Sequence, residues 1–215
     1  MNARRQKLAS IPLTVPKTDR RIQVLGTTVL RGKEANAVVV TLRNSSPKAI
    51  ADIPIAVDVL SPKGRRITTN TAPGTDHWLN HVPLIRPGQT IDWVNDQFDP
   101  DTKSVSAKVR VGIGTSVARP YPDANLLKTH YFKDPISGTS FTGKARSNAP
   151  VNQERLVVFS VGRQGGRIVS AGRGVVERLR ANGGNKSTFT IFYVGADPKS
   201  VQLSTLAPPV VSPKK

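Results

Sequence analysis

The sequence predicts an all-β protein with two similar β-sandwich domains in tandem. Segments 53–67 and 155–168 each carry apolar residues at every second position, which places those residues on one face of a strand. Each segment then reaches a glycine-containing turn and resumes as a second strand. This is typical of a β-hairpin, because glycine adopts the positive φ of tight turns. The 17 glycines and 17 prolines in 215 residues also favour many turns over long helices.

The first half of the chain begins with a polar segment, 1–18, interrupted by two prolines, and we expect it to be a flexible, disordered basic arm. A first sandwich domain is predicted over 19–117. Its strands end at turn signals such as the Asn-Ser-Ser-Pro sequence at 44–47. The predicted strands are 21–30, 36–44, 50–60, 65–71, 89–98 and 104–113.

The pattern restarts after 115–122, a segment with two prolines that we take as the domain boundary. A second sandwich domain is predicted over 118–206, and its strand at 141–145 ends at Ser147-Asn148. The other strands expected in this half are 126–132, the hairpin 155–168, 174–180, 187–194 and 200–203. Residues 207–215 form a proline-rich basic tail that we also expect to be flexible.

The two halves align as diverged copies of one unit. Val38 corresponds to Phe141 at an offset of 103 positions, and Gly88 corresponds to Gly183 at 95. In the hairpin strand, the face of Ile55, Val57 and Val59 aligns with that of Val157, Phe159 and Val161 at 102. Six or seven short strands in a copy of roughly 90–100 residues are typical of an immunoglobulin-like sandwich. The absence of cysteine excludes disulfides and an antibody-type Cys–Trp–Cys framework.

The net charge of +18 predicts attraction to polyanions, which include nucleic acid, anionic lipid and acidic cell-wall polymer. Residues 118–206 hold thirteen basic and five acidic residues, a net +8, against +4 for 18–117. We take six arginines as candidate polyanion-binding residues, although arginines beside strands also protect sheet edges and a basic surface also serves solubility. They are Arg155, Arg163, Arg167, Arg173, Arg178 and Arg180.

Three patterns resemble sites of chemistry, and we interpret each as structural. His77 and His81 have a zinc-ligand spacing but lie in a predicted loop. The carboxylates of Asp96, Asp99 and Asp101 lack the spacing of a calcium loop. Segment 162–167 is rich in glycine but leads into a strand, whereas phosphate-binding loops lead into a helix.

The sequence therefore predicts neither an enzyme nor a cofactor or metal site. It contains no Gly-x-Ser-x-Gly motif and no pair of carboxylates at an evident acid–base spacing. It also has no stretch of about 18 apolar residues that could span a membrane, and no apolar core follows its basic N-terminus as in a signal peptide.

The order of an Asn-Ser turn, an alternating strand, a glycine turn with arginine and an aromatic strand resembles the FxLYD-type immunoglobulin-like modules of bacterial envelope proteins. The resemblance covers residues 21–206 in two copies, with segment 157–162 in place of the Phe-x-Leu-Tyr-Asp string. It implies a non-enzymatic, extracytoplasmic module of the cell envelope, with a protein or an anionic envelope polymer as partner.

Two other functions remain open. The first is a nucleic-acid-binding basic β protein, because segment 128–133 interleaves aromatic and basic residues. The second is a decoration domain of a virion or surface appendage. The sequence names no specific ligand, partner or oligomeric state.

Overall fold

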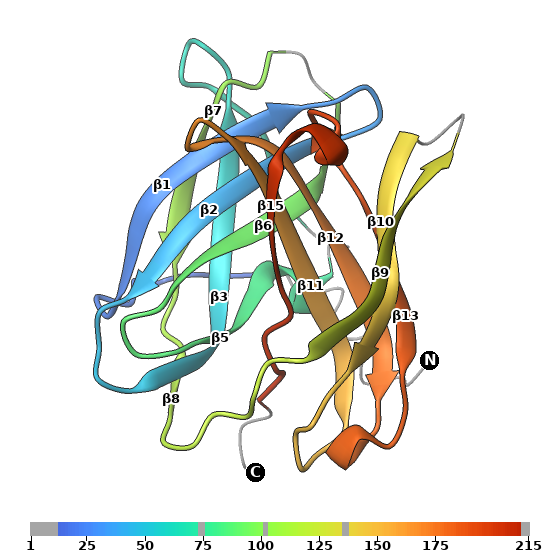
Figure 1. The fold of residues 1–215 in the computed structure, drawn as a ribbon. Coiled ribbons are helices and arrows are strands. Elements are labelled where there is room, and N and C mark those ends of the chain that lie inside the picture. Colours follow the sequence, from blue (N-terminus) through green and yellow to red (C-terminus); the bar gives the residue numbers. More distant parts are fainter. Residues whose placement is uncertain (1–12, 73–75, 101–102, 135–137, 212–215) are drawn as a thin grey trace.

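The computed structural model describes residues 13–72, 76–100, 103–134 and 138–211, and over these ranges the protein is all-β, as predicted. Every strand pairing is antiparallel, and the only helices of the described residues are three short 3₁₀ turns (Figure 1). No helix in these ranges is long and apolar enough to cross a membrane. The alternation of apolar residues therefore identified the fold class correctly.

The first half contains eight strands, which form two sheets. One sheet has the order β1–β2–β6, and in the other β3 pairs with β4, β5, β7 and β8. The strands are β1 (Ile22–Arg31), β2 (Asn36–Asn44), β3 (Ala49–Leu60), β4 (Arg66–Thr69), β5 (His81–Ile85), β6 (Thr90–Phe98), β7 (Ser106–Val111) and β8 (Thr115–Val117), with the turn η1 (His77–Asn80) before β5.

The second half contains seven strands, again in two sheets, with the orders β13–β10–β9 and β14–β12–β11–β15. The strands are β9 (Asn125–Asp134), β10 (Gly138–Arg146), β11 (Gln153–Gln164), β12 (Arg167–Leu179), β13 (Ser187–Phe192), β14 (Val194–Gly195) and β15 (Gln202–Leu206), with turns η2 (Ala181–Gly183) and η3 (Pro198–Ser200). Instead of the two separate segments expected after the hairpin turn, β12 is one continuous strand of 13 residues.

The same pairing scheme occurs in both halves. The second strand of each half, β2 or β10, lies at the centre of a three-stranded sheet, and the third, β3 or β11, lies inside the other sheet. The turn after the second strand is also repeated, because the side-chain oxygens of Asn44 and Ser147 each accept a hydrogen bond from the backbone N–H two residues later. The N–H groups of Gly88 and Gly183 donate to the carbonyls of these same residues. The offsets of 103 and 95 are therefore structural equivalences.

The expected alignment of the hairpin strand is wrong by one residue. Both β3 and β11 contain a residue with positive φ, Asp52 (51°) and Arg155 (54°), and these two residues are 103 positions apart. With that offset, Ile55 corresponds to Val158, which packs in the core of its own half. Val157 lies on the opposite face and packs against the first half. Both faces of β11 are apolar because both are buried, so alternation could not identify the inward face.

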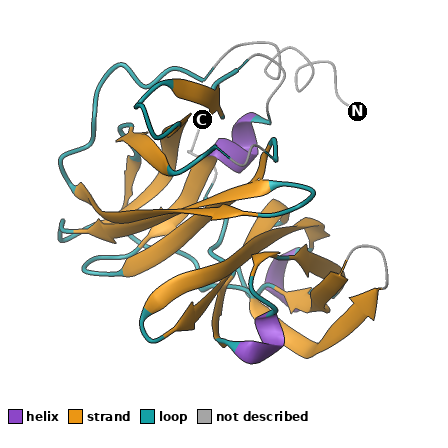
Figure 2. Ribbon diagram, turned by 90° about the horizontal axis from the view of Figure 1, so that it is seen from above, coloured by secondary structure: helices purple, strands orange, loops and turns teal. Residues whose placement is uncertain are grey.

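The sheets stack in layers, which are seen edge-on in Figure 2. In the first half, the face of β2 and β6 that includes Val40 and Trp93 packs on Ile55 of β3. In the second half, β11 and β12 pack on the sheet of β10 and β13 through Val158 and Phe189. The remaining faces of β6 and of β11–β12 pack on each other, and a single apolar cluster therefore extends from one half into the other. We call this contact the inter-half interface.

The described ends of the chain pack on the body instead of extending from it. Leu13 and Val15, within the expected flexible arm, are buried against Ala56. At the other end, Ala207 is buried and the backbone N–H of Val210 donates to Gln153 Oε1 at 2.6 Å. Residues 1–12 and 212–215 of the predicted arm and tail lie outside the described residues.

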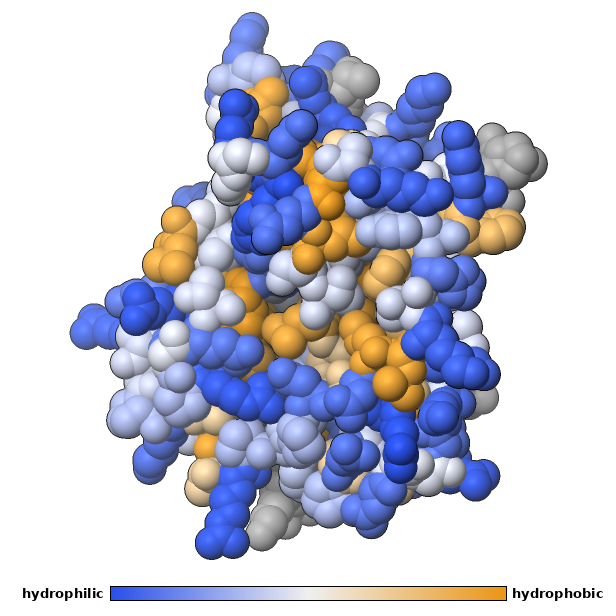
Figure 3. Space-filling view, viewed as in Figure 1, coloured by the Kyte–Doolittle hydropathy of each residue, from blue (hydrophilic) through white to orange (hydrophobic). Residues whose placement is uncertain are grey.

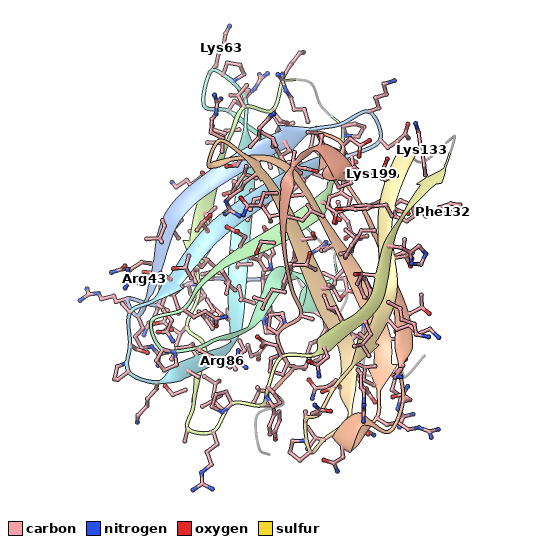
Figure 4. The ribbon with its side chains drawn as sticks, viewed as in Figure 1. Arg43, Lys63, Arg86, Phe132, Lys133 and Lys199 are labelled. Carbon is pink, nitrogen blue, oxygen red and sulfur yellow. The ribbon has the colours of Figure 1, made fainter. Side chains whose placement is uncertain are left out.

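The expected domain boundary lies on a segment that is held to the first half. Arg86, labelled in Figure 4, donates from Nη1 to Asp123 and from Nη2 to the carbonyl of Tyr121, both at 2.8 Å. These bonds connect the loop after β5 to the segment that leads into β9. The halves are thus joined by this anchored connection as well as by the inter-half interface.

Candidate functional site at the inter-half interface

Arg173 is the central polar residue of the inter-half interface. It lies on β12 and is only 7% exposed. Its Nε donates to Asp96 Oδ1 at 3.0 Å, and its backbone N–H donates to Asp96 Oδ2 at 2.9 Å. Its Nη atoms donate to the carbonyl of Leu79 and to the side chains of Asn95 and Gln97. Burial lowers the pKa of Arg173, whereas the charge of Asp96 opposes that shift.

Two further arginines of the second half reach carboxylates of the first. Arg163, at the end of β11, donates from Nη2 to Asp92 Oδ2 at 2.6 Å. Arg155, near the start of the same strand, forms a salt bridge with Asp76. The inter-half interface therefore combines an apolar core with three arginine–aspartate pairs, of which the Arg173 pair is the most buried.

The structure does not bring the six candidate arginines to one exposed surface. Arg155, Arg163 and Arg173 are engaged with aspartates of the first half, as described above. Arg167, Arg178 and Arg180 are exposed, but Arg167 begins β12 and the other two lie at its far end. The eleven positions between Arg167 and Arg178 correspond to roughly 35 Å along a strand. The candidate set is thus divided between an internal interface and two separate ends of a strand.

A signal for these pairings was present in the sequence. Arg155, Phe159 and Arg163 are four positions apart, with Val157 and Val161 between them, so an arginine stands at each end of one apolar strand face. On β6, Asp92 and Asp96 likewise alternate with Val94 on a single face. Opposite charges at the borders of two apolar faces indicate faces that pack together, but only the structure shows which faces meet.

A polar cleft of about 660 Å³ opens at one end of the inter-half interface. It is lined by residues of β4, η1 and β6 from the first half and of β11 and β12 from the second. Its lining contains four carboxamides together with carboxylates, two threonines and one arginine. The lining includes Asn70, Asn80, Asn95, Gln97, Arg155 and Glu177.

Hydrogen bonds hold the carboxamides of this cleft in place. Asn70 accepts from the backbone N–H of Val57 at 2.7 Å and donates to the carbonyl of Ile55 and to Asn80 Oδ1. Asn95 donates to the same Asn80 oxygen at 3.3 Å. These bonds fix the positions of the carboxamides, which can present hydrogen-bonding groups to a polar ligand.

The neighbouring pocket, of about 130 Å³, is more apolar. His81 lines it and is bonded through Nδ1 to Asp52 at 2.5 Å, while its buried Nε2 has no hydrogen-bond partner among the described residues. Trp78 also lines this pocket and is exposed. Val211 from the end of the chain also lines the pocket.

The structure describes parts of the sequence patterns that resemble metal or phosphate sites. Asp96 is engaged by Arg173, and Asp101 is outside the described residues. The segment 162–167 is the β11–β12 hairpin, with Gly165 and Gly166 at positive φ in its turn. Among the described residues, no group of three or more His, Cys, Asp or Glu could hold a metal ion.

A shallow groove of about 180 Å³ lies between β6 and β15 on the face shown in Figure 3. Hydrophilic side chains cover most of this face, and apolar side chains collect in the hollow near its centre. Phe159 and Leu206, which are register partners on β11 and β15, both line the groove.

No protein-family model matches this sequence, and a search of curated proteins finds no significant match.

Proposed function

We propose that this chain is a non-enzymatic interaction module of the cell envelope, built from two immunoglobulin-like sandwiches that act as one rigid unit. The observation that carries the proposal is the inter-half interface, where an apolar cluster and three arginine–aspartate pairs join the halves. Interfaces between domains of one chain are usually more polar and permit relative motion, whereas a large apolar interface suppresses it. A rigid double unit suits a spacer or docking element that holds a partner at a defined distance.

The proposed partner is a protein or an anionic polymer of the envelope. Three of the six candidate arginines are engaged at the inter-half interface, so attraction of a polymer would rest on the exposed Arg167, Arg178 and Arg180. Since these residues are dispersed, the attraction would be weak and would fall with salt.

Sedimentation with a purified bacterial envelope tests this function. We expect the full chain to pellet with the envelope fraction at 50 mM salt and to be released as salt rises. Replacement of Arg167, Arg178 and Arg180 by Gln should reduce the bound fraction, whereas the matched set Arg43, Lys63 and Arg65 to Gln should reduce it less. Failure to pellet, together with a cytosolic location on fractionation of the source cells, would contradict the proposal.

A further inference from the structure

The outward face of the sheet β13–β10–β9 is open in the second half. Tyr131 contacts the ring of Phe141 at 5.4 Å between centroids, and Phe141 contacts the buried Phe189 at 6.1 Å. These three rings are on the inward side. Residues next to them along each strand point outward, because side chains alternate across a strand. We call the outward side chains of these strands the open face.

Two phenylalanines stand in one row across the open face. Ser140 of the central strand pairs with Phe132 on one side and with Phe192 on the other. Adjacent strands are about 4.8 Å apart, so the backbone positions of the two phenylalanines are about 10 Å apart. Phe132 is 55% exposed and Phe192 53%, and Figure 4 shows Phe132 directed away from the body of the protein. Exposed aromatic rings clustered on a sheet indicate a binding surface.

Hydroxyl and basic side chains follow these rings along the open face. The next row contains His130, Thr142 and Thr190, and Lys144 and Arg146 follow along the central strand. Lys144 and Arg146 share the side of Ser140, whereas Lys133, opposite Thr139, lies on the other side of the sheet. The open face therefore carries two basic side chains beside its two aromatic rings.

The equivalent face of the first half shows what the open face lacks for packing against another sheet. There, Asp92 and Asp96 of β6 receive Arg163 and Arg173. In the first half, Asp92 of β6 lies opposite Thr41 of β2. The equivalent pair in the second half is Thr188 of β13 opposite Lys144 of β10, so Thr188 takes the place of Asp92. Without these carboxylates, the open face cannot pair with arginines as the inter-half interface does, and its charge favours an anionic occupant.

We propose that the open face binds single-stranded nucleic acid, with bases stacked on Phe132 and Phe192 and phosphates directed to Lys144 and Arg146. Aromatic rings stack with any base, and Lys or Arg beside them neutralise the phosphates. The headgroup of an anionic lipid would meet the charge but has no flat aromatic face to stack on the two rings. The inference goes beyond the proposed function and rests on a surface separate from the arginines tested there.

Fluorescence anisotropy of a labelled 12-nucleotide oligothymidylate with the full chain at 50 mM salt tests the proposal. We expect Phe132→Ala with Phe192→Ala to weaken binding at least tenfold, because base stacking contributes strongly at such sites. Leu25→Ala with Trp78→Ala, which removes two exposed apolar side chains elsewhere, should leave affinity unchanged. Phe132→Leu with Phe192→Leu provides a second variant that retains apolar surface, and it should also weaken binding.

The phosphate contacts have a separate readout. Lys144→Gln with Arg146→Gln should lower affinity and reduce the slope of log affinity against log salt by about 0.7 for each phosphate that is no longer neutralised. Arg43→Gln with Lys63→Gln changes the net charge equally and should alter the slope less. Figure 4 shows both control residues on the first half, away from β9.

Three results would overturn the proposal. The first is no binding of the oligonucleotide by the unaltered chain at 50 mM salt. The second is equal affinity of the phenylalanine variants and the unaltered chain, since binding would then be only electrostatic. The third is a dimer by light scattering that Phe192→Ala dissociates, because the occupant of the open face would then be a second copy of this chain.

Discussion

In the first half the outward face of sheet β1–β2–β6 is covered by the second half, whereas the equivalent face of sheet β13–β10–β9 is open. The pairing registers identify the equivalent residues: Val94 lies opposite Val39, and Thr190 lies opposite Thr142. The covered face thus carries Val94, Asp92 and Asp96 where the open face carries Thr190, Thr188 and Phe192. A few side chains on the repeated sheet therefore decide whether its outward face packs internally or remains free.

The largest expected effect is the loss of Arg173. Arg173→Ala should leave the partly buried Asp96 without its charged partner and should lower the free energy of unfolding by about 3–5 kcal/mol. Arg178→Ala, on the exposed end of the same strand, should change it by no more than about 0.5 kcal/mol. Denaturant unfolding measures both changes. Similar losses in the two variants would mean that the inter-half interface does not stabilise the fold.

An exchange of equivalent residues tests whether the two faces differ in this way. Val94→Thr places a hydroxyl in the buried face and should lower the free energy of unfolding by about 1–3 kcal/mol, the usual cost of an unsatisfied buried polar group. Thr190→Val makes the reciprocal change on the open face and should alter it by about 0.5 kcal/mol or less. Thermal and denaturant unfolding check both. The comparison fails if the exchange is equally costly on the two faces.

The smallest effects concern pH, and they differ in direction between the halves. In the first half, the hydrogen bond from Arg21 lowers the pKa of Asp19, so its stabilisation is present at neutral pH and is lost as pH falls below about 4. In the second half, burial raises the pKa of Tyr193 to about 12. Its neutral form is therefore favoured in the folded protein, and this stabilisation is lost as pH rises from about 10 to 12.

Stability measured against pH separates these two groups. Asp19→Asn should flatten the acid limb of the curve and leave the alkaline limb unchanged, whereas Tyr193→Phe should flatten only the alkaline limb. Because the halves share one core, we expect each limb to appear as a single unfolding transition of the whole chain. Two separate transitions would show that the halves unfold independently.

Much of the fold could be predicted from local patterns. Turn chemistry identified the Asn44 and Ser147 turns and the glycine turn at 165–166, because these conformations depend on side chains within a few residues. The internal repeat was also visible, since both halves retain the same strand order. The inward face of β11 could not be identified, because a strand buried on both sides carries apolar residues on both.

Local patterns in the sequence indicated most of the strands, their turns and their repetition, although not β5 and β8, and composition gave the positive charge. Only the tertiary structure decided how the charge is used. Arg173 and Arg178 look alike in the sequence, yet one is buried against Asp96 and the other faces solvent. The physical reason is that burial and ion pairing depend on residues about 80 positions away, which the packing of the two halves brings within hydrogen-bonding distance.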